Sequence, residues 1–213
     1  MLIIFDFDGT LISASWQGMF EAYTAIIKHI GKNPEEFFKN LDEFKKLLSI
    51  DWRKNFKKLG IKDKKTELKC NKLFYQVYNP YVFLFPWLGD VLSHLSEKKH
   101  KLAILSNGLT EYIISSLGEY GKYFCDIVGG DIVQNLKPNP EGVFYILNKY
   151  DFPKEKVWLI GDTIEDLAAA KAAGVKGGAV LWGLEETRVL IKYPNDFIFA
   201  SPFDFYLFFK FFK

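Results

Sequence analysis

The sequence predicts a doubly wound parallel α/β sheet with one all-helical insertion. Three observations lead to this prediction: short continuous apolar runs typical of strands buried on both faces, helix-like segments between them, and one long stretch of helical periodicity without a strand. Hydrophobic residues make up 49% of the 213 positions, so the chain can bury a substantial core and is not intrinsically disordered. The net charge of +2 favours no particular class of partner.

The alternation of strands and helices can be followed along the chain. The first apolar run, residues 2–5, is followed after the insertion by further runs of the same kind. A final helix is expected after Ser201, because a serine N-cap, Pro202 at the first helical position and Asp204 in the first turn form an ordinary helix start. We expect this aromatic helix to pack on the sheet or to form a dimer contact rather than to anchor in a membrane. The later strands are predicted at residues 101–105, 157–160, 178–182 and 196–199, and the helices between them at residues 88–98, 109–117, 140–150, 163–173 and 185–191.

The insertion divides the chain into two predicted domains. Residues 1–12 and 85–213 form the sheet-bearing core, and residues 13–84 form about four helices. Basic residues, mostly lysine, outnumber acidic ones in the insertion. We expect a solvated helix surface there rather than a nucleic-acid site. Helix breaks are predicted near residues 31–34, 50–51 and 59–63.

The sequence also indicates a compartment. It has no basic start followed by a long apolar segment, and no apolar run approaches the ~20 residues of a membrane span. We therefore expect a cytoplasmic protein that does not bind membranes. The two cysteines, Cys70 and Cys125, have no metal-binding spacing and are expected to be free thiols that pack as small hydrophobic residues.

Two aspartates, Asp6 and Asp8, follow the first strand in the run "IIFDFDGTLI". In a parallel α/β sheet, ligands bind outside the carboxyl ends of the strands. Gly9 lets the backbone turn sharply there and direct its N–H groups at an anion. Because an isolated Asp-x-Asp-Gly more often forms a simple turn, the rest of the sequence has to decide between a turn and a site.

A second acidic pair follows a later strand. In "IGDTIED", Asp162 ends the strand predicted at residues 157–160, and Asp166 comes four residues later in a helix. Two carboxylate clusters at one edge of a sheet would repel each other unless a cation neutralised them. Carboxylate oxygens without accompanying His or Cys pairs favour Mg²⁺ over zinc.

Two further segments supply groups that bind anions. The strand in "LAILSNG" ends at Ser106 and Asn107, which offer a hydroxyl and backbone donors. The segment "NLKPNP" places Lys137 between a turn and a helix start, where its charge would balance phosphate and carboxylate groups. Together with the two acidic pairs, these segments predict a phosphate site.

The four motifs, in this order between Asp6 and Asp166, resemble those of the haloacid dehalogenase superfamily, whose members are mostly phosphatases. Among its branches, the chain most resembles the phosphoglycolate phosphatase-like one, and the insertion lies where this family carries its helical cap. The resemblance implies a Rossmann-like core, a helical cap, and Mg²⁺-dependent hydrolysis of a small phosphorylated metabolite by a monomer or homodimer.

The resemblance also implies roles for the three aspartates that bind the metal. Asp6 would be the nucleophile and a ligand of Mg²⁺. Asp8 would be the general acid and base, and would bind Mg²⁺ through its backbone carbonyl. Asp162 would be the other carboxylate ligand. This arrangement suits the chemistry, because a phosphomonoester dianion repels a carboxylate nucleophile unless positive charge offsets the repulsion.

The remaining motif residues would surround the phosphoryl group. By the same resemblance, Ser106 and the backbone N–H groups near Asn107 would hold its oxygens, and Thr10 would support the phosphate loop. Lys137 would stabilise the nucleophile and the transferred group. Asp166 would orient Lys137 or metal-bound water.

Three alternatives to a phosphatase remain open. Phosphomutases of the β-phosphoglucomutase kind keep both aspartates and a similar cap. Hydrolytic dehalogenases resemble the chain at the nucleophile but lack the second aspartate, so Asp8 disfavours dehalogenation. A non-catalytic binding protein could keep the fold as an interaction module. Substrate choice is expected to reside in the insertion, where Trp16 and Arg53 are candidate contacts.

Overall fold

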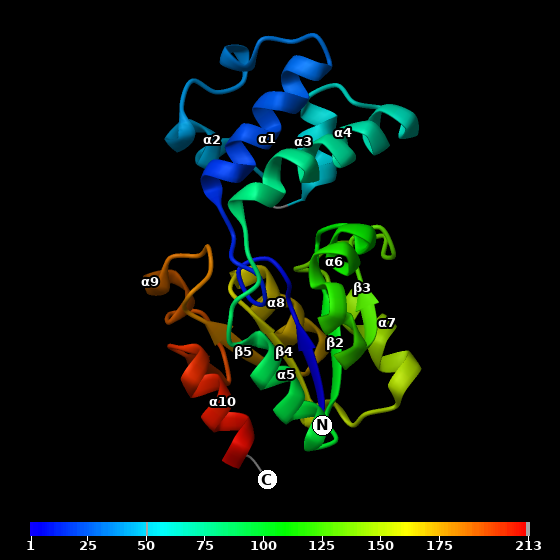
Figure 1. Cartoon of the computed structure of the whole chain (residues 1–213), viewed down its shortest axis with the longest axis vertical. Coiled ribbons are helices and arrows are strands. Elements are labelled where there is room, and N and C mark those ends of the chain that lie inside the picture. The colour runs from blue at the N-terminus through cyan, green and yellow to red at the C-terminus, as the bar shows by residue number, and fades with distance from the viewer. Residues whose placement is uncertain (50, 212–213) are drawn as a thin grey trace. The chain divides into compact units, whose positions relative to one another are not determined.

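The computed structural model describes residues 1–49 and 51–211. The chain forms two compact units, one comprising Met1–Ser13 and Leu84–Lys213 and the other Ala14–Phe83. Figure 1 shows that the first unit contains the sheet, whereas the regular elements described in the second unit are helices. We refer to them as the sheet unit and the helical unit.

Over its described residues, the sheet unit has six parallel strands in the order β3-β2-β1-β4-β5-β6. The chain moves outward from β1 to β3 and then returns to place β4 on the other side of β1. The predicted doubly wound α/β fold class is confirmed, and its topological switch point lies between β1 and β4. The strands are β1 (Leu2–Phe5), β2 (Lys101–Leu105), β3 (Phe124–Val128), β4 (Val157–Gly161), β5 (Lys176–Val180) and β6 (Phe197–Phe199).

Helices cover both faces of this sheet, as right-handed crossovers between parallel strands require. Helices α5 and α10 contact each other, and so do α7 and α8 (Figure 1). All four residues of β1 are buried, which explains why this strand is continuously apolar. The helices of the sheet unit are α5 (Leu88–Glu97), α6 (Thr110–Leu117), α7 (Glu141–Tyr150), α8 (Ile164–Ala173), α9 (Thr187–Leu190) and α10 (Pro202–Phe211), with 3-10 segments at Gly118–Tyr123 and Lys154–Lys156.

Two details of the sheet differ from the sequence prediction. Strand β3 was not predicted, because this edge strand is only half-buried and its sequence "FCDIV" lacks a continuous apolar run. Strand β5 was predicted at residues 178–182 but begins and ends two residues earlier. The chain leaves the sheet after Val180, and Trp182 donates its Nε1–H to the carbonyl of Thr10 at 3.2 Å.

The C-terminal helix α10 packs on the sheet, which is one of the two arrangements that the sequence predicts for it. Phe205 contacts Phe5 of β1 and Phe199 of β6, with ring centroids 5.6 and 5.0 Å apart. Ser201 and Asp204 form the predicted start of the helix, because the Asp204 carboxylate accepts from the Ser201 backbone N–H at 2.9 Å. Aromatic side chains therefore close this part of the core.

In the residues that the structure describes, the helical unit has four α-helices, and the periodicity predicts about four. They surround a core in which Tyr23 of α1 contacts Phe44, Phe56 and Phe74 from the other three helices. The prediction of a break at residues 50–51 includes Ile50, which lies outside the described residues. The helices are α1 (Trp16–His29), α2 (Leu41–Leu47), α3 (Trp52–Lys58) and α4 (Lys64–Tyr78), with 3-10 segments at Pro34–Glu36 and Asn79–Tyr81.

The chain leaves the sheet unit and returns to it at neighbouring positions. Ile12 and Leu84 form an isolated antiparallel bridge, and the N–H of Phe85 donates to the carbonyl of Leu11 at 3.4 Å. The two ends of the insertion are therefore held together within the sheet unit itself.

Within the part of the chain that the structure describes, no helix combines the length and the apolar character that a bilayer span requires.

Candidate active site

The motif residues of the sheet unit gather at the carboxyl ends of β1 and β4. Phe5 pairs with Ile160 in the parallel register, so Asp6, the residue after β1, lies level with Gly161, the last residue of β4. The backbone N–H of Asp6 donates to the carbonyl of Ile160 at 2.8 Å. This register places Asp6 and Asp162 together at the topological switch point, where doubly wound sheets bind ligands.

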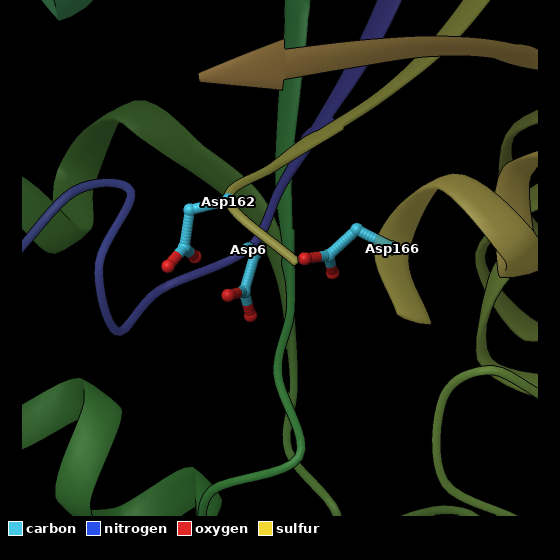
Figure 2. Close-up of side chains that lie close together, drawn as sticks. All are labelled: Asp6, Asp162 and Asp166. Atoms are coloured by element: carbon cyan, nitrogen blue, oxygen red, sulfur yellow. The ribbon is translucent and has the colours of Figure 1, made fainter. Parts of the chain in front are cut away.

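Three carboxylates form a buried acidic cluster at this point. One oxygen from each of Asp6, Asp162 and Asp166 lies within 4.8 Å of the others. Asp6 follows β1, Asp162 follows β4 and Asp166 lies in the first turn of α8 (Figure 2). Asp162 and Asp166 are fully buried and Asp6 is 7% exposed. Buried carboxylates at this spacing require compensating positive charge.

Lys137 supplies part of that charge. Its ammonium lies 2.6 Å from Asp6 Oδ1 and 2.5 Å from Asp166 Oδ1, and its side chain is 4% exposed. The second oxygen of Asp166 accepts from the Thr163 hydroxyl at 2.6 Å and from the Thr163 N–H at 3.1 Å, which completes a capping box at the start of α8. Both carboxylate oxygens of Asp166 thus accept hydrogen bonds, one from Lys137 and the other from Thr163.

The charges in the cluster shift one another's proton affinity. Burial raises the pKa of Asp6 well above its ordinary value; Lys137 opposes the rise, and Asp166 and Asp162 add to it. Burial raises the pKa of Asp162 to about 7, with a further contribution from the charge of Asp166. Burial alone would lower the pKa of Lys137, but Asp166 and Asp6 outweigh it, so its pKa lies above the ordinary value. Three carboxylates facing one ammonium leave an excess of negative charge, which fits a divalent cation held by oxygen ligands.

Asp162 is held by the loops that follow β1 and β5. Its Oδ1 accepts from the Thr10 hydroxyl at 3.2 Å and its Oδ2 from the Leu184 N–H at 2.7 Å. Gly9, at φ +82°, and Gly183 both approach the side chain so closely that a Cβ at either position would lie 2.2 Å from an Asp162 atom. These two glycines let the backbone enclose the carboxylate.

Asn107 fixes the segment that carries Lys137. Its side-chain amide accepts from the Lys137 N–H at 2.9 Å and donates to the Lys137 carbonyl at 3.2 Å. The neighbouring Ser106 is 3% exposed, and its hydroxyl oxygen accepts from the Gly108 N–H at 3.0 Å. The Asn107 side chain therefore acts on Lys137, while the predicted phosphate contact concerns the backbone beside it.

Asp8 lies beside the acidic cluster with a partner of its own. The Tyr112 hydroxyl, in the first turn of α6, donates to Asp8 Oδ1 at 3.0 Å. Burial raises the pKa of Asp8 to about 6, and the bond from Tyr112 and the charge of Lys137 oppose the rise. A carboxyl group with such a pKa is suited to proton transfer near neutral pH.

Thr10, Trp16 and Arg53 have surroundings that the sequence did not indicate. The Thr10 side chain is directed to Asp162, so its predicted support of the phosphate loop remains a prediction. In the helical unit, half-buried Trp16 packs against the apolar core and lies under the ammonium of Lys45, 5.9 Å from the ring centroid. The guanidinium of Arg53 lies 5.5 Å from the ring centroid of Trp52.

Several supporting residues escaped the sequence analysis. Thr163 could have been found, because Thr-x-x-Asp before an apolar helix is a capping-box pattern. Tyr112 carried only a positional signal, since the first helical turn after a parallel strand lies at the carboxyl edge of the sheet. The sequence contains no pattern that identifies Gly183 and Leu184, because their contacts with Asp162 depend on the geometry of the loop after β5.

The fold and the buried carboxylate–lysine cluster at the switch point define an α/β enzyme site for anionic substrates. A family model described as haloacid dehalogenase-like hydrolase matches residues 3–180. The chain therefore belongs to the haloacid dehalogenase-like hydrolases, and the resemblance seen in the four motifs is confirmed.

Curated relatives support the predicted branch of this family. A phosphoglycolate phosphatase from Aquifex aeolicus is 34% identical over 210 residues, which cover 95% of this chain and 93% of the relative. A phosphoglycolate phosphatase from Salmonella typhi is 31% identical over 133 residues, which cover 62% of this chain and only 53% of the relative. The match thus spans about half the length of the Salmonella protein but nearly all of the Aquifex protein.

Solved structures agree with the family assignment. A protein from Bacteroides fragilis, assigned as a haloacid dehalogenase-like hydrolase, superposes with a TM-score of 0.76 at 26% identity and covers 94% of this chain and 97% of its own. A protein from Thermotoga maritima, assigned as a β-phosphoglucomutase, gives a TM-score of 0.69 at 25% identity and covers 93% of each chain. The structural neighbours thus include one protein assigned as a hydrolase and one assigned as a phosphomutase.

Proposed function

We propose that this protein is a Mg²⁺-dependent phosphatase that hydrolyses a small phosphomonoester through an aspartyl-phosphate intermediate. The observation that carries the proposal is the placement of Asp6, Lys137 and Asp166 in one buried ion-pair network beside Asp162, with Asp8 next to it. This arrangement combines a nucleophile, a fixed positive charge and a separate proton donor at the end of β1.

Asp6 is the proposed nucleophile. Lys137 holds its Oδ1 at 2.6 Å, which orients the carboxylate and leaves Oδ2 for attack on phosphorus. The same ammonium offsets the charge of the approaching phosphate dianion, and its ion pair with Asp166 at 2.5 Å helps to hold it in place. Asn107 fixes the backbone of Lys137, so the position of the charge is set before substrate binds.

Asp8 is the proposed general acid and base. In the first step it protonates the leaving alkoxide, while Asp6 becomes an aspartyl phosphate. In the second step it takes a proton from the attacking water, and hydrolysis restores Asp6 and releases inorganic phosphate. Asp6 and Asp8 can serve as nucleophile and proton donor respectively, because Asp6 is ion-paired with Lys137 whereas Asp8 is hydrogen-bonded to the uncharged Tyr112 hydroxyl.

Asp6, Asp162 and the backbone carbonyl of Asp8 are the proposed ligands of Mg²⁺. When bound, the ion would offset phosphate charge and help to align the phosphoryl group with the nucleophile. The commitment of Asp166 to Lys137 and Thr163 supports its assignment as a supporting residue rather than a direct ligand.

Mg²⁺ added to EDTA-treated protein should raise the melting temperature by about 5–10 °C, because a ligand at ~100 times its Kd stabilises the folded state by about 2.7 kcal/mol. Asp162→Asn should abolish most of this shift. Asp126→Asn is the matched control, since Asp126 lies in the same unit and pairs with Lys149 instead. Differential scanning calorimetry measures the shift, and an equal rise in both variants would contradict the assignment of Asp162.

A small phosphorylated acid of the phosphoglycolate kind is the proposed substrate. Support comes from the Aquifex relative, whose similarity covers nearly the whole of both chains. We propose that residues 14–83 act as a cap that selects the substrate, with Trp16 and Arg53 as candidate contacts. A cytoplasmic monomer or homodimer without nucleic-acid or membrane partners would suit this role.

A phosphomutase is the second candidate function, favoured by the likeness to the Thermotoga protein. Both functions use the same aspartyl phosphate. They differ in whether water or a substrate hydroxyl accepts the phosphoryl group.

A phosphate-release assay of the purified protein tests the proposal. The panel comprises an aryl phosphate, phosphoglycolate, sugar phosphates and nucleotides, each with and without Mg²⁺. We expect Mg²⁺-dependent release of inorganic phosphate, greatest with a small acidic substrate. Conversion of a sugar phosphate to its isomer without phosphate release would instead establish the mutase.

A further inference from the structure

The two carboxylate oxygens of Asp8 differ in their hydrogen bonding, because the Tyr112 hydroxyl donates to Oδ1. We propose that Tyr112 is a positioning residue that reserves Asp8 Oδ1 for its own hydrogen bond and leaves Oδ2 as the oxygen that transfers protons. This inference rests on the proposed phosphatase function, in which Asp8 is the general acid and base.

The position of Tyr112 is fixed by packing. Tyr112 is 4% exposed, and its side chain extends from the first turn of α6, just after the loop of Ser106 and Asn107. Its ring meets the ring of Phe7 edge-on, with centroids 5.7 Å apart and planes at 82°. Phe7 is fully buried and lies between Asp6 and Asp8 in the sequence. The residue that separates the two aspartates therefore also supports the tyrosine ring.

The hydroxyl of Tyr112 distinguishes the two oxygens of Asp8. It donates to Oδ1 at 3.0 Å, so in the acid form of Asp8 the proton lies on Oδ2. The bond also opposes rotation of the carboxyl group, because any orientation between the two equivalent ones would lose the bond to Tyr112. A proton donor with a fixed direction contributes more to catalysis than one that has to find its orientation in each turnover.

The two chemical steps then use one oxygen of Asp8. In the first, an Asp6 oxygen bonds to phosphorus, the bond from phosphorus to the leaving oxygen breaks, and the proton on Asp8 Oδ2 passes to that leaving oxygen. In the second, Oδ2 takes a proton from water, the water oxygen bonds to phosphorus and the bond from phosphorus to Asp6 breaks. Phosphate leaves, and both aspartates return to their starting states.

Leaving groups of different basicity separate this role from a purely structural one. An alkoxide has to be protonated as it leaves, whereas p-nitrophenolate leaves readily without a proton. A mispositioned Asp8 should therefore impair the first step for an alkyl phosphate and affect it little for p-nitrophenyl phosphate. A general loosening of the site would impair both.

Tyr112→Phe and Tyr150→Phe form a matched pair for this test. Each substitution removes one tyrosine hydroxyl from the sheet unit, but the Tyr150 hydroxyl donates to the carbonyl of Cys125 at 2.6 Å, in β3. We expect Tyr112→Phe to lower kcat/KM for a simple alkyl phosphate about 10- to 100-fold, the range of a hydrogen bond to a charged group. For p-nitrophenyl phosphate the change in kcat/KM should stay within about twofold. Tyr150→Phe should leave the ratio of the two substrates unchanged.

The second step gives an independent readout. Slower proton removal from water should make phosphoenzyme accumulate, seen as a burst of p-nitrophenolate in Tyr112→Phe. Equal losses on both substrates, or no loss on either, would overturn the positioning role. Asp8→Asn separates this result from a failure of the proposed function. If the wild-type protein releases no phosphate, or if Asp8→Asn keeps wild-type kcat/KM on the alkyl phosphate, the general acid assignment fails and the role of Tyr112 is overturned with it.

Discussion

Asp6→Asn should leave a folded protein whose phosphatase activity is reduced by roughly 10³-fold or more. A neutral amide cannot form the aspartyl phosphate, and Lys137 retains Asp166 as its second partner at 2.5 Å. Removal of one of three buried carboxylates also relieves repulsion from Asp162 and Asp166, so the melting temperature in EDTA should not fall by more than a few degrees. Phosphate release and differential scanning calorimetry measure the two effects.

Asp126→Asn is the control for Asp6→Asn, because it makes the same chemical change at an ion pair in β3, remote in the fold from the acidic cluster. That variant should keep full activity. Acid-quenched protein incubated with labelled substrate should carry label in the control and none in Asp6→Asn. Residual activity above about 1% in a clean preparation of Asp6→Asn would contradict the assignment of the nucleophile.

Lys137→Met should produce the largest loss of stability among substitutions in the site. It leaves Asp6 and Asp166 buried without the ammonium that lies within 2.6 Å of both. Breaking a buried ion pair by removing one partner costs about 3–5 kcal/mol, because the remaining charge is uncompensated. Urea denaturation in EDTA should show a loss of that size, and phosphatase activity should fall at least about 100-fold.

Two comparisons test the reason for this loss. Lys149→Met removes a partly exposed lysine from its pair with Asp126 and should cost much less, because solvent screens that pair. Adding Asp166→Asn to Lys137→Met should restore part of the lost stability, since one unpaired carboxylate is then neutral. Additive losses in the double variant would mean that Lys137 stabilises the protein by packing rather than by charge.

The sequence was sufficient to predict the fold where strands are buried on both faces. β1, β2 and β4 are central, and their apolar composition follows directly from that position. β3 escaped prediction because an edge strand has fewer buried positions, so polar residues such as Asp126 interrupt the pattern. The boundary of β5 was misplaced because Leu181 and Trp182 continue the apolar run after the strand has ended.

For the site, the spacing of motifs in the sequence predicts which residues come together but not the hydrogen bonds between them. Asp6 and Asp162 directly follow strands and Lys137 lies in the loop between β3 and α7, so their convergence follows from the topology of a parallel sheet. The bonds between them depend on side-chain directions that a single sequence does not contain. The Asn107 clamp on Lys137 joins residues 30 positions apart, and the Tyr112 bond to Asp8 joins residues 104 positions apart.

The bridge between Ile12 and Leu84 bears on how proteins of this kind can diversify. Because the chain departs and returns at two backbone positions that already lie side by side, an insert of almost any length can be accommodated there without moving a strand. Loop-closure entropy grows only slowly with the length of the insert. Evolution can therefore exchange the 70 residues of Ala14–Phe83 as a unit, while the catalytic sheet retains its order and register.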